Sequence, residues 1–464
     1  MLRPTSVALL LVLAPAALHA QAPAPPDPAG AHATLRAIGS AASVERVAAD
    51  LATVVGFGTR HTLSDTLSDT RGIGAARRWV HAELSRISAA CDGCIDVEYH
   101  TTVVPPGRRM PDSVAVVNVL GIQRGTRDPD RYIIVSGHLD SRASDAMDAE
   151  SDAPGAVDDA SGVAAVLEAA RLLSRHRFDA TIVYAAVSGE EQGLYGSDAL
   201  ARRAQEEGWF VEAMFTNDVV GNVQGIDGIV DSTTVRVFSE GVRADETERM
   251  ARVRRSTGGE VDSPARQLAR YIHRIAAEHV PAIDVMMIYR LDRFGRGGDH
   301  SPFSARGFPA VRFTEPHEDY RRQHQDVRIE DGVEYGDVLE EAEPSYTARV
   351  AGLNAAVIAA MASAPRPPSQ VEIEGAVRPS TTLRWQAADS ALAPDLAGYR
   401  VYWRETTAPV WQHSAWVGAV TEHTIENVVI DNWYFGVAAV DRDGYESPVV
   451  FAGPIGEWTP QAAE

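Results

Sequence analysis

Positive charge is scarce in this chain of 464 residues. Lysine and arginine together number 43 against 64 aspartate and glutamate residues, which gives a formal net charge of −21 at pH 7. A surface this acidic repels phosphate backbones and anionic lipids, which argues against a nucleic-acid-binding protein. Hydrophobic residues at 45% and charged residues at 23% are ordinary for a globular protein. The surplus carboxylates are typical of a surface that keeps a protein soluble.

Long apolar runs are also missing. Beyond the N-terminus no segment reaches the roughly 18 uninterrupted apolar residues of a membrane-spanning helix. The apolar stretch 7–18 is too short to span a bilayer, follows Arg3 and precedes small residues, which is the pattern of a signal peptide. We predict that residues 1–20 are that peptide, with cleavage after Ala20 and Ala22 as the alternative. The mature protein is then exported to the periplasm or the medium and has no membrane span.

Cysteine is limited to Cys91 and Cys94, in the sequence Cys-Asp-Gly-Cys. In an exported chain the simplest interpretation of this spacing is a short-loop disulfide. The alternatives are a redox motif, which would normally open a helix, and a zinc knuckle, which needs two further thiol or imidazole ligands nearby. We therefore predict a bond between Cys91 and Cys94.

Apolar strands alternate with amphipathic helices over most of the chain. The periodicity predicts helices over residues 43–55, 72–89, 161–173, 195–207, 263–280 and 344–361. It predicts strands over 97–104, 114–122, 132–135, 180–187, 211–219, 285–289 and 310–314. This alternation favours an α/β fold in which helices cover both faces of a sheet with a parallel centre. The Pro/Ala-rich residues 21–33 are predicted to be a flexible leader, and 223–262 a charged surface insertion.

The composition changes after residue 362. Residues 363–369 form a proline-rich linker, and residues 370–464 contain short strands, turn signals and no helical period. Strands are predicted over 370–374, 382–385, 398–403, 421–426, 433–440 and 449–451, which indicates a small all-β sandwich. Its Trp385, Tyr399, Trp403 and Tyr434 resemble the core tryptophan and tyrosine positions of fibronectin type III domains.

Polar residues that can bind metal follow the predicted strands of the larger domain. The strand at 132–135 leads into His138-Leu-Asp140, and the strand at 180–187 into Glu190-Glu191. Further along, Asp218 lies where an apolar strand ends, His317 and His324 follow the strand at 310–314, and a turn carries Asp158-Asp159. The carboxyl ends of parallel strands meet at one edge of a sheet, so these side chains are expected to converge.

The chemistry of this set favours zinc. Two adjacent glutamates repel each other unless a positive charge holds them, and a divalent cation supplies that charge. Imidazole and carboxylate ligands together suit zinc better than calcium, and one bridging carboxylate would place two ions about 3.5–4 Å apart. In His138-Leu-Asp140 the carboxylate is expected to orient the metal-binding imidazole.

Residues 43–362 resemble the co-catalytic dizinc aminopeptidases of the bacterial leucyl aminopeptidase and aminopeptidase Y type, a family that also includes glutamate carboxypeptidases. The motifs that carry the resemblance are Gly-Phe57-Gly-Thr-Arg60-His, Gly-His138-Leu-Asp140-Ser, Pro-Gly-Ala-Val-Asp158-Asp-Ala-Ser-Gly, Ser-Gly-Glu190-Glu191, Asn-Asp218 and Gly-Gly-Asp299-His300-Ser-Pro-Phe303. The resemblance implies that residues 34–362 form the zinc peptidase domain, a three-layer α/β/α sandwich with a mixed, mainly parallel sheet.

The resemblance also implies roles for individual residues. Asp158 would bridge two zinc ions, His138 and Asp218 would complete one site, and Glu191 and His324 the other. Glu190 would be the general base. A cis peptide bond would follow Asp158 and turn Asp159 toward backbone amides or an arginine. The family usually has Tyr-His-Thr at its last histidine, whereas this chain has Gln-His324-Gln, so His317 stays open as the alternative ligand.

The expected activity is that of an aminopeptidase acting on peptides with a free N-terminus. Carboxylates around the metal attract an α-ammonium group, and Glu190 can pass a proton from water to the leaving amine. Carboxypeptidase or dipeptidase action stays open because Arg290, Arg293 and Arg296 could bind a terminal carboxylate. A glutaminyl cyclase, which resembles this family but uses one zinc, and a non-catalytic binding protein also stay open. The β-sandwich could hold a polypeptide substrate, attach to a surface or brace the catalytic domain.

Overall fold

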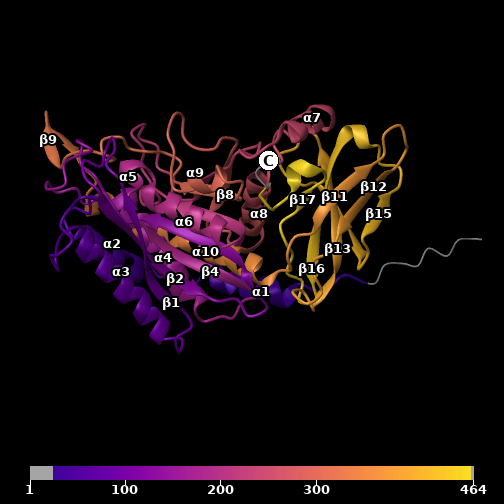
Figure 1. Ribbon diagram of the computed structural model, residues 1–464, viewed down its shortest axis with the longest axis horizontal. Coiled ribbons are helices and arrows are strands. Elements are labelled where there is room, and N and C mark those ends of the chain that lie inside the picture. The colour runs from indigo at the N-terminus through magenta and orange to yellow at the C-terminus, as the bar shows by residue number, and fades with distance from the viewer. Residues whose placement is uncertain (1–23, 461–464) are drawn as a thin grey trace, which may run out of the picture.

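The computed structural model describes residues 24–460, and its larger domain is built on one eight-stranded sheet (Figure 1). The strands lie in the order β1-β2-β4-β3-β5-β8-β6-β7. Their bounds are β1 Asp96–Val104, β2 Val114–Gln123, β3 Asp128–His138, β4 Ala180–Val187, β5 Phe210–Asn217, β6 Thr234–Phe238, β7 Asp284–Ile288 and β8 Ala310–Thr314. The centre β4-β3-β5-β8 is parallel, whereas β1 with β2, β2 with β4, and β6 with β8 pair antiparallel.

Helices cover both faces of this sheet. Their bounds are α1 Ala29–Gly39, α2 Val44–Val55, α3 Gly72–Ala89, α4 Ser161–Leu173, α5 Glu190–Gly193, α6 Tyr195–Glu206, α7 Glu248–Thr257, α8 Pro264–His279, α9 Ser301–Ser304 and α10 Pro344–Ser363. Alternate residues of the central strands point to opposite faces. Ile133 and Val135 of β3 belong to the core formed with α2, α3, α4, α8 and α10, while Ile134 belongs to the core formed with α6 and α9. The predicted α/β/α fold with a mixed, mainly parallel sheet is thus confirmed.

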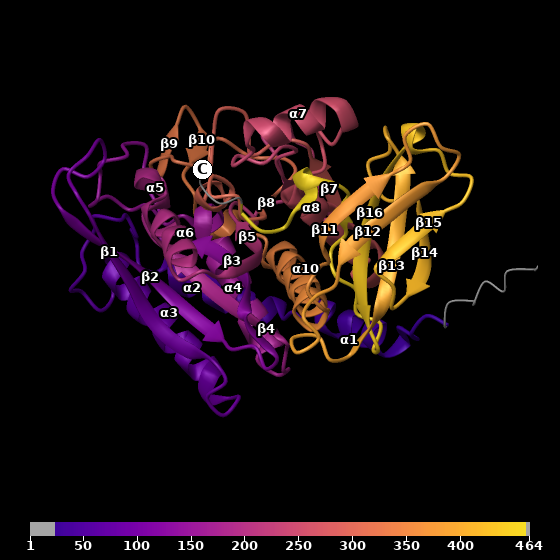
Figure 2. The same ribbon diagram turned by 45° about the vertical axis from the view of Figure 1, so that its right-hand side comes forward.

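The C-terminal domain is a sandwich of two antiparallel sheets (Figure 2). One sheet contains β11 (Ser369–Glu374), β12 (Thr381–Gln386) and β15 (Glu422–Ile425). The other contains β14 (His413–Gly418), β13 (Leu396–Glu405), β16 (Trp433–Asp441) and β17 (Val450–Phe451). Trp385 and Tyr399 face each other in the core between the sheets, with ring centroids 5.3 Å apart. The all-β sandwich is confirmed, and its fibronectin type III character stays a prediction.

The structure corrects several details of the sequence interpretation. Helix α1 begins at Ala29, inside the segment predicted to be a flexible leader, because Ala31, Leu35 and Ile38 give it an apolar face. The predicted surface insertion contains β6, a strand of the main sheet, as well as α7. Strand β14 and the hairpin of β9 (Arg328–Glu330) and β10 (Val333–Tyr335) were not predicted. The predicted signal peptide lies outside the described residues.

The disulfide prediction is confirmed. Cys91 and Cys94 are bonded in the turn that leads from α3 to β1. Across residues 24–460, no helix is long and apolar enough to cross a membrane.

A buried ion-pair cluster joins the two domains. Asp262, just before α8, accepts hydrogen bonds from Arg270 of α8 at 2.8 Å and from Arg404 of β13 at 2.7 and 2.8 Å. The side chains of all three are at most 2% exposed. Removing one partner of such a cluster would leave a buried charge uncompensated, so breaking this contact between the domains is costly.

Candidate metal centre

The residues predicted to bind metal converge at the carboxyl edge of the parallel strands. His138 is the last residue of β3, Glu190 and Glu191 begin α5 after β4, and Asp218 follows β5. His324 lies in the loop after β8. Since β4, β3, β5 and β8 are neighbours in the sheet, the same edge receives all of these side chains.

Two groups of possible ligands share Asp158. His138, Asp158 and Asp218 form one group, and Asp158, Glu191 and His324 form the other. Nε2 of His138 lies 3.0 Å from Oδ1 of Asp158, and Nε2 of His324 lies 3.2 Å from Oδ2. The two oxygens of one carboxylate therefore face two different imidazoles. Ligand atoms around a tetrahedral zinc ion lie roughly 3.3 Å apart, which agrees with these distances.

One polar atom of this cluster lacks a hydrogen-bond partner. Oε1 of Glu191 is buried and has no hydrogen-bond partner among the described residues, although Nε2 of His324 lies only 2.9 Å from it. Buried polar groups normally find partners, and those that do not can mark an ion site. Although burial lowers the pKa of His324, Glu191 and Asp158 raise it to about 10. The cluster thus stabilises positive charge, and its donor set fits zinc.

Asp158 owes its position to the turn before α4. The peptide bond between Asp158 and Asp159 is cis, as predicted, and Gly155 has φ +53°, a left-handed conformation that favours glycine. Both carboxylate oxygens of Asp337 accept backbone N–H bonds here, from Val157 at 2.8 Å and Asp158 at 2.7 Å. Asp337 therefore stabilises the turn through its backbone N–H groups, and the side chain of Asp158 faces the two imidazoles.

Asp159 points away from the two imidazoles and accepts backbone amides, as predicted. Its Oδ2 accepts from His138 N at 2.8 Å, and its Oδ1 accepts from Gly162 N at 3.0 Å and Val219 N at 3.3 Å. Val219 has φ +64°, a strained conformation for a β-branched residue. The hydrogen bond from the N–H of Val219 to Asp159 helps to stabilise this strained conformation next to Asp218.

The predicted task of Asp140 needs a correction. The expectation was that its carboxylate orients the imidazole of His138, but Nδ1 of His138 bonds to the backbone oxygen of Asp140 at 2.9 Å, and the carboxylate lies 3.9 Å away. The carboxylate instead accepts N–H bonds from Gly189, Glu190 and Glu191 at 2.9, 3.3 and 3.1 Å. Asp140 thus holds the turn that carries both glutamates, a task that residue spacing could not reveal.

Glu190 lies at the start of α5, beside the cluster. Burial raises its pKa well above the usual range, and the charges of Glu191, Asp218 and Asp299 add to this effect while His138 opposes it. A carboxylate with a raised pKa accepts a proton more readily than an ordinary glutamate.

Sequence reasoning missed Arg312 of β8. Its fully buried guanidinium lies 2.8 Å from Oδ1 of Asp218 and 3.1 Å from Oδ2 of Asp292. Burial alone would raise the pKa of Asp218, but Arg312 and His138 outweigh this effect and hold that pKa well below its usual range. Neither an arginine inside an apolar strand nor Asp292 in a distant loop carried a motif, so no signal in the sequence pointed to this pair.

Of the two histidines left open by the sequence, His324 lies in the cluster. His317 instead places its Nδ1 3.0 Å from Oδ2 of Asp227, a partly exposed pair. The Asp299 carboxyl is buried, and burial raises its pKa to about 7.

Comparisons with known proteins agree with this geometry. The model of peptidase family M28 matches residues 118–331, the segment that contains every ligand candidate. A probable zinc metalloprotease of Pyrenophora tritici-repentis is 42% identical over 435 residues, covering 93% of this chain and 88% of that protein. One from Leptosphaeria maculans is 44% identical over 413 residues, covering 89% and 95%. This chain belongs to peptidase family M28.

The M28 assignment makes the protein a zinc metallopeptidase and therefore a hydrolase, as the motifs implied. The solved structure of LapB from Legionella pneumophila shares the fold, with a TM-score of 0.51 and 17% identity over 72% of this chain and 75% of that chain.

We predict that Asp140→Asn lowers both kcat and zinc content. An amide accepts hydrogen bonds through one oxygen only, so at least one N–H of the 189–191 turn would lose its partner. Loss of such supporting contacts costs about 10–100-fold in metal affinity or activity. Enzyme assays and metal analysis of the purified variant test this expectation.

Asp145→Asn is the matched control, because Asp145 also accepts a backbone N–H bond, from Met147 at 2.9 Å, but in an exposed loop. It should leave both quantities unchanged. An Asp140→Asn protein with full zinc content and wild-type kcat would contradict the task assigned to this carboxylate.

Proposed function

We propose that this M28 peptidase is an aminopeptidase that binds two zinc ions and removes the N-terminal residue of peptides. The observation that supports two ions is the placement of Asp158, whose two oxygens face His138 and His324 at 3.0 and 3.2 Å. Asp218 and Glu191 complete the two groups. Zinc, when bound, polarises a carbonyl and makes water a nucleophile at neutral pH.

Glu190 is the proposed general base. Its neighbour Glu191 faces His324, so Glu190 is free to take a proton from the attacking water and to deliver it to the leaving amine. Its raised pKa suits both halves of this transfer. Asp140 positions the backbone of Glu190 and Glu191 for these separate roles.

The charges around the centre favour an N-terminal ammonium over a C-terminal carboxylate. Carboxylates of Asp158, Glu190, Glu191, Asp218 and Asp299 gather at this edge of the sheet. Two of the three arginines that could bind a substrate carboxylate are already engaged. Arg293 lies 2.9 Å from Glu318, and Arg296 bonds to Gln323 at 3.2 Å. This pairing supports aminopeptidase over carboxypeptidase action.

The decisive experiment is a substrate panel assayed with and without a chelator. We expect hydrolysis of aminoacyl-4-nitroanilides and of peptides with a free N-terminus, no hydrolysis of N-acetylated peptides, loss of activity with chelator, and recovery with zinc. Preferential release of C-terminal residues from N-acetylated peptides would overturn the proposal in favour of a carboxypeptidase. Cyclisation of N-terminal glutamine without hydrolysis would indicate a glutaminyl cyclase.

Substitutions of the two glutamates should have different effects, because the proposed roles of Glu190 and Glu191 differ. Glu190→Gln should keep its zinc but lower kcat by about 10²–10⁴-fold, because an amide cannot accept the proton. Glu191→Gln should lower the zinc content itself. Metal analysis beside kinetics distinguishes the two, and the reversed pattern would exchange the roles of these residues.

We further propose that the protein is exported. The N-terminal signal-peptide pattern and the Cys91–Cys94 disulfide, which persists in oxidising compartments, both support export. Expression of the full chain in a bacterial host should give a secreted or periplasmic protein that begins at Gln21 or Pro23, as N-terminal sequencing would show. Accumulation of an uncleaved chain in the cytoplasm would contradict export.

A further inference from the structure

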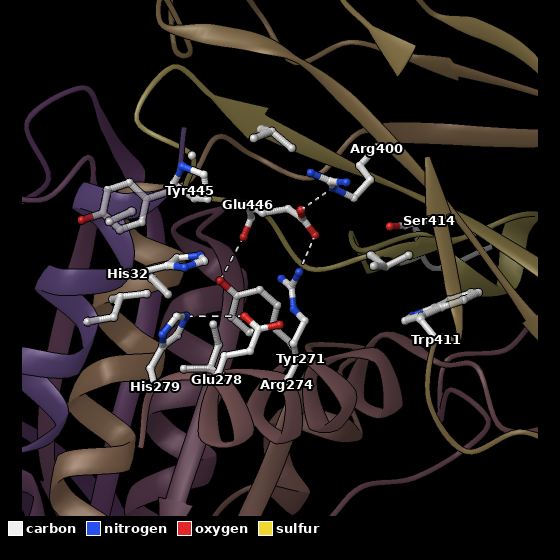
Figure 3. A pocket seen from close by; sticks show the side chains of 18 of the residues that line it. His32, Tyr271, Arg274, Glu278, His279, Arg400, Trp411, Ser414, Tyr445 and Glu446 are labelled. Atoms are coloured by element: carbon white, nitrogen blue, oxygen red, sulfur yellow. Dashed lines mark hydrogen bonds and ion pairs between the residues drawn. The ribbon is translucent and has the colours of Figure 1, made fainter. Parts of the chain in front are cut away.

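A second group of side chains that could bind a metal ion lies far along the chain from the motifs of the catalytic centre. His32 of α1 and Glu278 and His279 at the end of α8 each offer one ligand atom, and these atoms lie within 4.8 Å of one another. Figure 3 shows the two imidazoles one above the other with Glu278 beside them. Their ring centroids are 4.7 Å apart.

The imidazole of His279 is poorly satisfied for a buried polar group. The residue is 3% exposed, and its Nδ1 is buried with no hydrogen-bond partner among the described residues. Its Nε2 lies 3.5 Å from Oε2 of Glu278, longer than the roughly 2.7–3.2 Å of an ordinary hydrogen bond. Nε2, the nitrogen that faces Glu278, is therefore the one placed to bind an ion shared with that carboxylate.

The surroundings of the cluster contain one feature that attracts a cation, the end of α8, and two guanidinium groups that oppose it, those of Arg36 and Arg274. Glu278 and His279 occupy the last two positions of a 16-residue helix, where the backbone carbonyls carry a partial negative charge. The guanidinium of Arg274, one turn earlier on the same helix, is compensated by Glu446 of the β-sandwich at 2.6 Å.

Water and ions can reach the cluster. His32, Glu278 and His279 line a cavity of about 610 Å³ between the two domains, together with Tyr445 and Trp411 of the sandwich. A site with three protein ligands needs a fourth, and a cavity of this size supplies water. Glu278 is exposed, so its side chain is free to rotate and close the remaining distance to the ion.

We propose that His32, Glu278 and His279 bind a divalent transition-metal ion of the zinc class. Two imidazoles and one carboxylate form a ligand set typical of zinc. Soft ions prefer thiolate ligands and hard ions such as Ca²⁺ and Mg²⁺ prefer oxygen ligands, so both suit this site less well. The ion would fasten α1 to the end of α8, beside the contact with the C-terminal domain. The site is structural and separate from the catalytic centre, so it does not depend on the number of ions bound there.

The test compares zinc content and stability among matched variants. The mature protein and its variants are stripped with chelator, reloaded with excess zinc, desalted and analysed for metal per chain. Wild type should bind one more zinc ion per chain than either His32→Gln or His279→Ala. The melting temperature of wild type should rise with free zinc beyond the rise seen in either variant.

His273→Ala is the control, because His273 lies on the same helix and lines the same cavity but is outside the cluster. It should keep the wild-type zinc content. Equal zinc in wild type, His32→Gln and His279→Ala would overturn the proposal, and so would an equal loss in His273→Ala. If His279→Ala fails to fold, His32→Gln and Glu278→Gln change exposed or half-buried side chains and decide the matter.

The location of the ion can be checked independently of the catalytic centre. A crystal of the zinc-loaded protein should show an anomalous scattering peak about 2.0–2.1 Å from a ring nitrogen of both His32 and His279. A Glu191→Gln protein that has lost activity but still shows this peak would demonstrate that the two metal sites are independent. Absence of the peak in crystals grown with excess zinc would refute this site and leave the proposed catalytic function untouched.

Discussion

The buried carboxylate of Asp159 connects the elements on which the metal centre depends. Its two oxygens accept three backbone N–H groups, from the end of β3, from the first turn of α4 and from the residue after Asp218. Three chain segments that are far apart in sequence are thereby fixed at one point. Because buried N–H groups need partners, substitution of this carboxylate by an apolar group would release all three at once. These three bonds fix His138 and the residue after Asp218 relative to the turn that carries Asp158.

Arginine alone provides the permanent positive charges that offset the buried carboxylates, since the sequence contains no lysine. A guanidinium has five donors in a fixed plane and can serve several acceptors at once. Arg312 uses this property to reach Asp218, Asp292 and the oxygen of Gly297. Arg60, also buried, bonds to the oxygens of Leu139 and Gly155 and so braces the turn before Asp158. A single ammonium group could not replace either side chain.

The sequence predicted those elements whose pattern is set locally. The helices at residues 72–89 and 161–173 and the strands at 180–187 and 310–314 agree with the structure at both ends, because apolar periodicity and turn residues bound them. Strand β6 was missed because it is short, carries Arg236 and lies within a charged segment. The ligand candidates were found because each follows a strand or a glycine-flanked turn. Asp337 and Arg312 were missed because only tertiary packing brings them to the metal centre. Residue spacing also could not show that the backbone oxygen of Asp140, rather than its carboxylate, accepts the hydrogen bond from His138.

The C-terminal sandwich is part of the same physical unit as the catalytic domain. The M28 family model ends at residue 331, yet the similarity to the Pyrenophora tritici-repentis protein extends over 93% of this chain and therefore into the sandwich. The contacts explain why the two parts stay together. Asp262 and Arg404 are fully buried across the boundary, and Trp458 donates its indole N–H to the oxygen of Glu212 in β5 at 2.8 Å. Separation would take the Asp262 carboxylate from Arg404 and the carbonyl acceptor from the indole, and would leave Asp262 with Arg270 alone.

The same contacts connect the sandwich to the elements that surround the metal centre. Arg404 and Glu446 hold α8 through Asp262, Arg270 and Arg274, and α8 packs against β7, β8 and α10. Strand β8 in turn carries Arg312 and leads into the loop with His324. A tightly packed interior transmits small displacements rather than absorbing them. Every link from Arg404 to Asp218 is a buried ion pair or a packed element, which is the kind of contact that bracing of the catalytic domain would require.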